Sequence, residues 1–270
     1  MFRITSPALA AGGRLAIAVL LLAVLAGGLG LLQAATRPAQ APAAAPPPRS
    51  IPDPAPVQPG TAVPQVEEPA PAAEPAEAGA ADPVRDWADE IAAVQDIPAR
   101  AVVSYVNAEL AMHQFQPQCG VSWTTLAGIG RIESDHGRFG TRQLDEEARP
   151  TEPIIGVALD GVPGVQHIPD TDGGALDGDP VLDRAVGPMQ FIPSTWQKWA
   201  TDGTGNGKAD PQNLDDAAVT AARYLCSGER DMSSGEGWWS GVLGYNNSVE
   251  YGQQVYALAE GYAAAGGRRE

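Results

Sequence analysis

The sequence divides sharply into a stretch that cannot build a hydrophobic core and a stretch that can. Residues 36–82 consist mostly of Ala, Pro, Gln and Glu, in runs such as "PAQAPAAAPPPRS" and "EEPAPAAEPAEAGAAD". A segment with so few large apolar side chains cannot bury enough surface to offset the conformational entropy lost on folding. We therefore predict a disordered linker over residues 36–82 and a globular domain over residues 83–266.

A second boundary lies upstream of this linker. Residues 15–32, "LAIAVLLLAVLAGGLGLL", form an uninterrupted apolar run behind Arg3 and Arg14, which is the pattern of a secretory signal or of a membrane anchor. Small residues near Ala35 would allow cleavage, and the length of the run would also allow it to span a bilayer. We therefore expect residues 1–35 to be a signal peptide or a signal anchor, and the protein to be exported.

The net charge of the chain argues against one class of binding partner. The formal net charge is −16 at pH 7, whereas nucleic-acid binding requires a basic patch that neutralises phosphates. We therefore exclude nucleic acid as a partner, and we expect a monomer.

The two cysteines, Cys119 and Cys226, both lie in the globular part, and an even pair in an exported protein is more often bridged than free. The sequence thus predicts a disulfide between them.

The pattern between residues 83 and 266 is helical nearly everywhere and predicts an all-α domain with long loops, without a credible series of strands. The expected helices lie at 96–115 with an Asp96 cap, at 122–137 with a Ser122 cap, and after Ser194, Asp215 and Ser248. Residues 150–184 do not fit this pattern, because loops of that length inside a compact domain are usually functional or disordered. Their Ile, Val and Leu residues argue against disorder, so we expect an ordered loop beside a cleft.

Glu133 is an acidic residue near the end of an otherwise largely apolar helix. If the helix begins near Ser122, the residues Leu126, Gly130 and Glu133 lie on one of its faces. The carboxyl group should therefore point toward the domain interior, like the apolar residues of that face. Burial disfavours the ionised carboxylate and raises its pKa, which is what a general acid at neutral pH requires. The alternative is a solvated glutamate at a frayed helix end, paired with Arg131, Arg138 or His136. The spacing alone does not choose between these two hypotheses.

Two further stretches carry polar groups that suit sugar recognition. The first, "AVGPMQFIPSTW", presents Gln190 from a tight Gly-Pro turn, and the second, "LGYNNSVEYGQQVY", places Tyr245, Asn246 and Tyr251 around a turn and a helix start. Aromatic rings offer flat stacking faces, and amides offer donors and acceptors to hydroxyl and N-acetyl groups. For each tyrosine alone, core packing is the competing explanation.

The stretches "IESDHGRFG", "GPMQFIPSTW" and "GYNNSVEY" together resemble the lytic murein transglycosylases, in particular the membrane-bound lytic murein transglycosylase B family with its lysozyme-like domain. The resemblance implies an enzyme of the cell envelope that cleaves the β-1,4 bond between N-acetylmuramic acid and N-acetylglucosamine in peptidoglycan and leaves a 1,6-anhydro sugar. It implies that Glu133 is the single catalytic acid and base. The substrate-contacting positions that it implies are Gln190, Tyr245, Asn246 and Tyr251. Ala185 and Val186 depart from the family, whose members often have a small or hydroxyl residue followed by Met.

A single carboxyl group is enough for this reaction, although ordinary glycosidases use two. The N-acetyl oxygen of the substrate can stabilise the positive centre, and its C6 hydroxyl can attack and return a proton to the same glutamate. Two positions along a helix from Glu133, Asp135 points away from it, so we expect a structural or capping role for Asp135. A hydrolytic muramidase with a second acid in residues 150–184 and a non-catalytic wall-binding module are the alternative functions.

A glycine-rich loop in the second half of the domain partly follows the order of an EF-hand. In "DGTGNGKADPQN", residues 202–213, Gly207 stands at the sharp turn and Asn213 replaces the final Glu. The ligands that this loop would offer are Asp202, Thr204, Asn206, the Lys208 carbonyl and Asp210. With two carboxylates it would bind structural calcium weakly, at ~10⁻⁴ to 10⁻³ M, and the alternative is a turn without an ion. The run 170–179 is a less regular candidate for a metal, and the reaction itself requires no cofactor.

Overall fold

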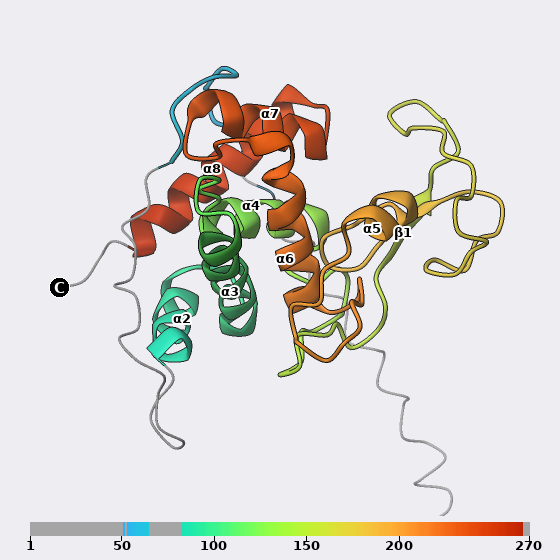
Figure 1. Cartoon of the computed structure of the whole chain (residues 1–270), viewed down its shortest axis with the longest axis horizontal. Helices are drawn as coiled ribbons and strands as arrows, with labels where there is room; N and C mark the ends of the chain where they lie inside the picture. The colour runs from blue at the N-terminus through green and yellow to red at the C-terminus, as the bar shows by residue number, and fades with distance from the viewer. Residues whose placement is uncertain (1–50, 52, 65–82, 267–270) are drawn as a thin grey trace, which may run out of the picture. The chain divides into compact units, whose positions relative to one another are not determined.

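The computed structural model describes residue 51, residues 53–64 and residues 83–266 (Figure 1). The predicted signal or anchor over residues 1–35 and most of the predicted linker lie outside these residues. Among the described helices, none is both long enough and apolar enough to cross a membrane. The described chain is thus the globular part and one short segment that precedes it.

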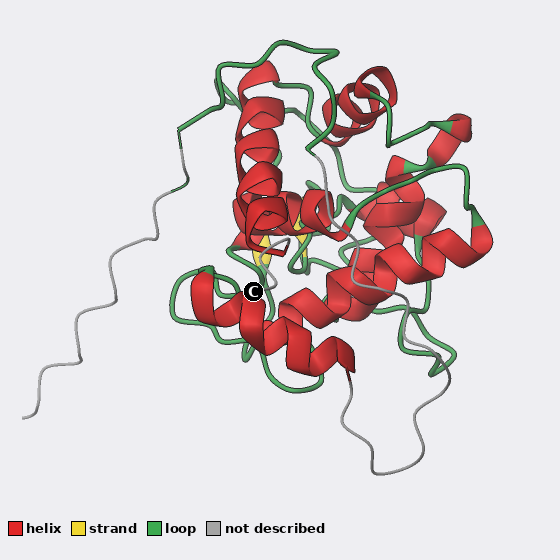
Figure 2. Ribbon diagram, turned by 90° about the vertical axis from the view of Figure 1, so that its left-hand side faces the viewer, coloured by secondary structure: helices red, strands yellow, loops and turns green. Residues whose placement is uncertain are grey.

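The described residues form a mostly helical domain, which confirms the all-α prediction (Figure 2). Its elements, labelled as in Figure 1, are α2 (Pro83–Val94), α3 (Ala99–Phe115), α4 (Trp123–Ser134), β1 (Ile155–Ala158), β2 (Arg184–Val186), α5 (Pro193–Trp199), α6 (Leu214–Leu225), the 3-10 turn η1 (Ser227–Glu229), α7 (Gly235–Tyr245) and α8 (Val249–Gly266). Helix α6 lies between α3 and α5, and α4 packs against both α3 and α8. Helix α4 is therefore the central element of the core.

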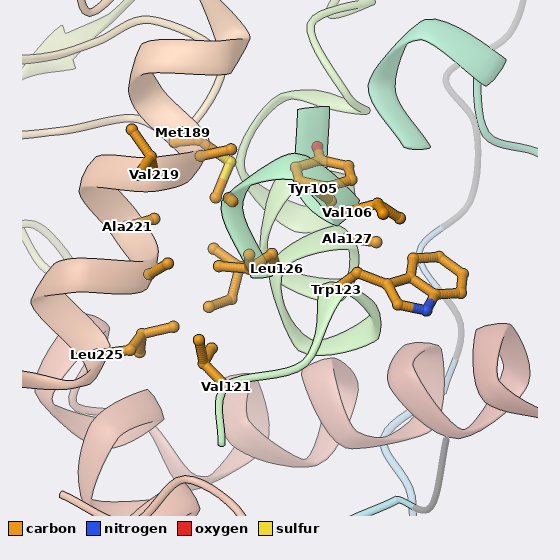
Figure 3. Packing of buried hydrophobic residues seen from close by; sticks show 14 of the residues in the cluster. Tyr105, Val106, Val121, Trp123, Leu126, Ala127, Met189, Val219, Ala221 and Leu225 are labelled. Carbon is orange, nitrogen blue, oxygen red and sulfur yellow. The ribbon is translucent and has the colours of Figure 1, made fainter. Parts of the chain in front are cut away.

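Two glycines allow α4 to be buried along nearly its whole length. A Cβ on Gly128 would lie 2.9 Å from the carbonyl oxygen of Val255 in α8, and a Cβ on Gly130 would overlap the hydroxyl of Tyr105 in α3. Because neither residue has a side chain, both neighbouring helices approach the α4 backbone closely. Figure 3 shows Leu126 of α4 among the buried side chains that surround it.

Both ends of α4 are capped, the N-terminus by the side chain of Ser122 and the C-terminus by the backbone of Asp135. Ser122 is the N-cap, as predicted, and its hydroxyl accepts a 3.3 Å hydrogen bond from the Thr125 amide. At the other end Asp135 adopts a left-handed conformation (φ 53°), and its amide donates to the Arg131 carbonyl. The Asp135 carboxylate forms ion pairs with Arg131 and Arg138. These contacts confirm the capping and structural role expected for Asp135.

Two other helix starts differ from the prediction. Helix α3 begins after Pro98, without a side-chain cap, because the proline ring presets φ and removes an amide that would need a partner. Asp96, the expected cap, instead forms an ion pair with Arg138 at 3.0 Å. Helix α6 begins before Asp215, because the Asn213 side chain accepts from the Asp215 amide and caps the helix two residues earlier.

Cys119 and Cys226 form the predicted disulfide, with their Cα atoms 5.5 Å apart. The bond joins the turn after α3 to the residue that ends α6. Both cysteines are fully buried, and the Gln116 side chain donates a 2.9 Å hydrogen bond to the Cys226 carbonyl at the same place. The bridge therefore fixes one end of the packed pair of helices α3 and α6.

Residues 150–184 are ordered, as predicted, but they contain β1 and end at the first residue of β2, a strand pair that the sequence pattern did not reveal. Strands β1 and β2 are antiparallel, with Ile155 opposite Val186 and Ala158 opposite Arg184. At four and three residues they are too short to show the alternation by which strands are recognised. The expectation of no strands is therefore wrong for this pair.

The aspartates of this segment bind the backbone of their own loop. Asp170 accepts hydrogen bonds from the amides of residues 172–174, and Asp179 accepts from the Val181 amide at 3.1 Å. Bonds of this kind stabilise turns that belong to neither helix nor sheet. The Val181 amide is also the largest cause that lowers the pKa of Asp179. The acidic run therefore contributes to the order of its own loop.

Residues 53–64, which we call the strap, fall within the predicted linker but pack on the domain. The Gln253 side chain in α8 donates a 2.7 Å hydrogen bond to the Val57 carbonyl, and Val57 packs against the core. Further along, the strap passes so close to the start of α7 that a Cβ on Gly235 would overlap the Gly60 carbonyl. The strap is therefore held by both polar and apolar contacts.

Removal of the disulfide should destabilise the domain. Closing a loop between cysteines 107 positions apart lowers the entropy of the unfolded chain by the equivalent of about 4–5 kcal/mol in the chain-entropy model. We expect the Cys119→Ala/Cys226→Ala variant to lose about that much free energy of unfolding, measured by urea denaturation without reductant. Reduction of the wild type should reproduce the loss, and an unchanged urea midpoint for the variant would contradict the prediction.

Candidate active site

The side chains of Glu133 and Tyr251 meet where the end of α4 faces the start of α8. The Tyr251 hydroxyl donates a 2.6 Å hydrogen bond to Glu133 Oε1. Tyr251 is buried and Glu133 is partly buried, which agrees with the inward orientation predicted from the helix spacing. The alternative pairing with Arg131 does not occur, because Arg131 forms its ion pairs with Asp96 and Asp135.

Burial raises the pKa of Glu133 to about 7. The hydrogen bond from Tyr251 acts in the opposite direction, because it favours the ionised carboxylate and so lowers the pKa. A carboxyl group with this pKa is populated in both protonation states near neutral pH. It can therefore both give and take a proton in one reaction cycle, as general acid–base catalysis requires.

Ser134, the residue next to Glu133, fixes the end of α4 to the turn that carries Gln190. The Ser134 hydroxyl donates a 2.5 Å hydrogen bond to the Pro188 carbonyl and accepts a 2.8 Å hydrogen bond from the Gly137 amide. The serine is buried, so these bonds are not in competition with water. The carboxyl group and the turn are consequently held at a fixed separation.

Gln190 is presented from this turn in a defined orientation. Its backbone is left-handed (φ 49°), and its side-chain Nε2 donates a 2.9 Å hydrogen bond to the Gly187 carbonyl within the same turn. Its Oε1 faces Gly156 of β1, where an added Cβ would lie 2.9 Å from that oxygen. The strand pair therefore borders the Gln190 amide.

Tyr245 and Asn246, adjacent at the end of α7, differ in their surroundings. The Tyr245 hydroxyl donates a 2.7 Å hydrogen bond to the Met189 carbonyl, which links α7 to the turn of Gln190. Burial and then the nearby Glu133 carboxylate raise the pKa of Tyr245 well above its ordinary value. Asn246 ends the helix and is exposed. The structure thus brings Glu133, Tyr251, Tyr245 and the Gln190 turn together and leaves Asn246 on the surface.

A buried histidine, which the sequence analysis considered only as a possible partner of a solvated Glu133, supports this arrangement. His136 is fully buried, with the Tyr105 hydroxyl 3.2 Å from Nδ1 and the Tyr262 hydroxyl 3.1 Å from Nε2. The histidine and Ser134 lie within three residues of Glu133 in "IESDHG", and this closeness is the signal that could have identified them. Their partners come from distant parts of the chain, which the local pattern does not show.

The predicted calcium loop, residues 202–213, is organised by Asp202. Its carboxylate accepts hydrogen bonds from the amides of Gly205 at 2.7 Å and Gly207 at 2.6 Å, and from the Thr204 hydroxyl at 3.0 Å. These bonds lower the pKa of Asp202, with the Gly207 amide as the largest cause. A calcium ion at this carboxylate would have to replace protein donors that already satisfy it.

Two other predicted ligands of the loop, Asn206 and Asp210, also have protein partners. Asn206 Oδ1 accepts a 2.9 Å hydrogen bond from the Lys208 amide, and Asp210 forms an ion pair with Arg149 at 2.8 Å. Asp216, which was not among the predicted ligands, is fully buried and accepts from three amides of the loop. Asp216 therefore anchors the loop to the first turn of α6, three positions beyond the place where an EF-hand has its last ligand.

A second group of carboxylates is spaced as a metal site requires. One oxygen each of Asp170, Asp172 and Asp183 lies within 4.8 Å of the others, close enough to hold an ion. Across the described ranges this is the one group of at least three acidic, His or Cys side chains with such spacing. Carboxylate oxygens are the ligands that calcium prefers. The run 170–179 thus supplies two members of the group.

Comparison with known proteins places the chain beside transglycosylases. Residues 183–243 match the family model of the transglycosylase SLT domain, which confirms the resemblance expected from the motifs. A search of curated proteins found no match. Among solved structures, the chain is similar to the Escherichia coli lytic transglycosylase Slt35 in complex with bulgecin A, at 16% identity and a TM-score of 0.40, over 68% of this chain and 78% of that one.

Two further solved structures resemble the chain to a similar degree. Slt35 in complex with calcium matches at 16% identity with a TM-score of 0.41, over 68% of this chain and 78% of that one. SltB3 from Pseudomonas aeruginosa in complex with NAG-anhNAM-pentapeptide matches at 16% identity with a TM-score of 0.35, over 69% and 68% of the two chains. All of these relatives are distant in sequence.

Glu133 should make the stability of the domain depend on pH with a definite sign. Its folded pKa of about 7 lies above the ordinary value of 4.5, so between these values the folded protein binds more protons than the unfolded chain. The stabilisation is therefore complete below the unfolded pKa and is lost as pH rises through about 7. We expect Glu133→Gln, which cannot ionise, to be about 1–3 kcal/mol more stable than wild type at about pH 8.5.

The same two proteins should be equally stable at about pH 4, where Glu133 is protonated in both the folded and the unfolded chain. Urea unfolding of both proteins at the two pH values is the measurement. A difference in unfolding free energy that is the same at both pH values would show that ionisation of Glu133 is not its cause.

Proposed function

We propose that this chain is a lytic transglycosylase that cleaves the β-1,4 bond between N-acetylmuramic acid and N-acetylglucosamine in peptidoglycan and forms a 1,6-anhydromuramic product. The observation that carries the proposal is the partly buried Glu133 carboxyl group, with a pKa of about 7 and a hydrogen bond from Tyr251. It is joined through Ser134 to the turn of Gln190, which lies in the segment similar to the transglycosylase SLT domain.

In the first step Glu133 acts as the general acid. Tyr251 donates to Oε1, and within the described part of the chain Oε2 has no hydrogen-bond partner, so Oε2 is the atom that carries the proton. Transfer of this proton to the glycosidic oxygen breaks the bond between that oxygen and C1 of the muramic acid. The N-acetylglucosamine leaves with a new hydroxyl, and the N-acetyl oxygen of the muramic acid stabilises C1.

In the second step the ionised Glu133 acts as the base. It takes the proton of the muramic acid C6 hydroxyl as O6 attacks C1, and the new O6–C1 bond closes the anhydro ring. The carboxyl group is then protonated again, so the cycle needs no other proton donor. The hydrogen bond from Tyr251 stabilises the carboxylate between the two steps.

The surroundings of Glu133 favour this reaction over hydrolysis. A hydrolytic muramidase needs a second carboxylate, at about 5–5.5 Å for retention or about 6.5–9.5 Å for inversion. The described side chains that the structure brings to Glu133 are Tyr251, Tyr245 and the Gln190 amide, and none of them is a carboxylate. A non-catalytic wall-binding module, in turn, would have no use for a carboxyl group whose pKa is raised to neutrality.

The remaining site residues have binding roles in this proposal. The substrate contacts are Gln190, Tyr245, Asn246 and Tyr251, with Tyr251 also orienting Glu133. Residues 1–35 export or anchor the chain, residues 36–82 connect it, and residues 83–266 act on glycan strands as a monomer facing the cell wall.

Structural calcium in residues 202–213 is a further part of the proposal, separate from the reaction. The ligands would be Asp202, Thr204, Asn206, the Lys208 carbonyl and Asp210. Because Asp202 and Asp210 now bind protein donors, the ion would have to displace these contacts. The carboxylates of Asp170, Asp172 and Asp183 form the competing site.

The Glu133→Gln variant should fold and bind glycan but lose turnover. Glutamine keeps the size of the side chain but cannot give or take the proton, so the loss of acid–base catalysis should lower the rate at least ~10²- to 10⁴-fold. The measurement is release of 1,6-anhydromuropeptides from purified peptidoglycan by wild type and variant at equal folded concentration. Comparable release by both proteins would refute the catalytic role of Glu133.

Glu250→Gln is the matched control for this experiment. Glu250 lies in the first turn of α8, next to Tyr251, and is exposed, so its neutralisation should leave turnover unchanged. Products with reducing ends, released by the wild type in place of anhydro sugars, would instead identify a hydrolytic muramidase.

Calcium should raise the melting temperature if either acidic loop binds it, because a ligand that binds the folded state stabilises it by mass action. Thermal unfolding with and without about 10 mM calcium is the measurement, and an unchanged melt would exclude both sites at that concentration. Asp202→Asn should abolish the response if residues 202–213 hold the ion. If Asp172→Asn loses the calcium response and Asp202→Asn keeps it, the ion binds at the run 170–179 instead.

A further inference from the structure

A row of three aromatic rings leads from the candidate active site in α7, across α6, to α5. The ring of Tyr245 contacts Tyr224 edge-on, with centroids 5.7 Å apart, and Tyr224 contacts Trp199 in the same way at 5.8 Å. The Tyr224 hydroxyl is fixed by a 2.7 Å hydrogen bond to the Gly244 carbonyl. Trp199, at the end of the row, is partly exposed, so the row reaches solvent there.

Positively charged side chains gather around the outer end of this row. Lys198 Nζ lies 5.2 Å from the centre of the Trp199 ring, and the Arg223 guanidinium carbon lies 5.7 Å from it. Arg223 also donates to the Trp199 carbonyl and the Thr201 hydroxyl, both at 3.3 Å. These contacts hold the two cations over the Trp199 ring while both residues stay exposed.

The cations at Trp199 differ from most others in the described chain because they have no acidic partner. No described carboxylate lies within 4.0 Å of Lys198 or Arg223, and the same holds for Arg230 beside Tyr224 and for Lys208. The other described arginines all form ion pairs with carboxylates: Arg85, Arg100, Arg131, Arg138, Arg142, Arg149 and Arg184. In a chain with net charge −16, two of these four cations thus lie at Trp199, the outer end of the aromatic row, and Arg230 lies beside its middle ring.

We propose that Lys198, Trp199 and Arg223 form a subsite for the carboxylate-bearing peptide stem of a peptidoglycan strand whose sugars lie along Tyr245 and Tyr224. The inference rests on the proposed function and extends it from the glycan to the peptide. Each N-acetylmuramic acid of such a strand carries a short peptide that ends in a carboxylate. An exposed ammonium and a guanidinium bind carboxylates, and an indole face packs against the apolar parts of a peptide.

The arrangement also explains why the two cations lie on an aromatic ring instead of on an acidic residue. An ion pair with an aspartate would neutralise each cation and would compete with an incoming carboxylate. A contact with the Trp199 ring restricts the side chain but leaves N–H donors of the cation open to a ligand. Preorganisation of this kind lowers the entropy lost on binding.

The test compares two substrates: glycan strands with their peptide stems, and the same strands after an amidase has removed the stems. The full-length chain carries Glu133→Gln so that the strands stay intact during binding. Adding Lys198→Gln and Arg223→Gln should weaken binding of the stem-bearing strands roughly three- to tenfold at low salt and leave binding of the stripped strands unchanged. High salt should remove the difference, because exposed charges are screened.

Arg85→Gln is the control, since it removes an exposed cation of α2 that is paired with Glu146; it should affect neither substrate. Equal weakening of both substrates by the double variant would show a structural role, and no weakening of either would show no role, so either result overturns the proposal. Failure of the proposed reaction is a separate outcome: the wild type would release no anhydro product, while the preference for stem-bearing strands could still be measured.

Discussion

The close approach of α3 and α8 to the α4 backbone determines where the rest of the candidate site lies. At Gly128 the α8 backbone comes so near that a methyl group would press on Val255, and one turn of α8 from that contact Tyr251 reaches Glu133. At Gly130 the Tyr105 hydroxyl occupies the space of a side chain. A larger residue at position 128 would therefore displace α8, which carries Tyr251, and a larger residue at position 130 would displace Tyr105. The position of Tyr251, whose hydrogen bond lowers the pKa of Glu133, thus depends on the packing at Gly128.

Those parts of the structure that depend on local spacing could be predicted from the sequence. The inward orientation of Glu133 follows from its i, i+3 and i+4 relation to Gly130 and Leu126, and the Ser122 cap follows from hydroxyl chemistry at a helix start. The disulfide follows from an even cysteine count in an exported chain. In each case the deciding information lies within a few residues or in composition, so no knowledge of the tertiary structure was needed.

Features that depend on a distant partner could not be predicted in the same way. The role of Ser134 depends on its hydrogen bond to the Pro188 carbonyl, which lies 54 positions away in the sequence. The role of His136 depends on contacts with tyrosines on two other helices. The strap has the composition of a linker, and its contacts with Gln253, almost 200 positions further along the chain, and with Gly235 show why it is bound. Asp216 was not among the ligands predicted from the EF-hand pattern, because it lies three residues beyond the last position of that pattern.

The bound strap changes how far the domain can travel from a point of attachment upstream. A polyproline-like chain extends ~3.1 Å per residue, so residues 36–82, fully drawn out, would place the domain up to about 145 Å from that point. On the linker prediction, fastening residues 53–64 to α8 and α7 would leave residues 36–52 to set this distance, or about 50 Å. The volume open to the domain would then fall with the cube of this radius, roughly twenty- to thirtyfold. The contacts that hold the strap would therefore limit the range of the domain without changing the surroundings of Glu133.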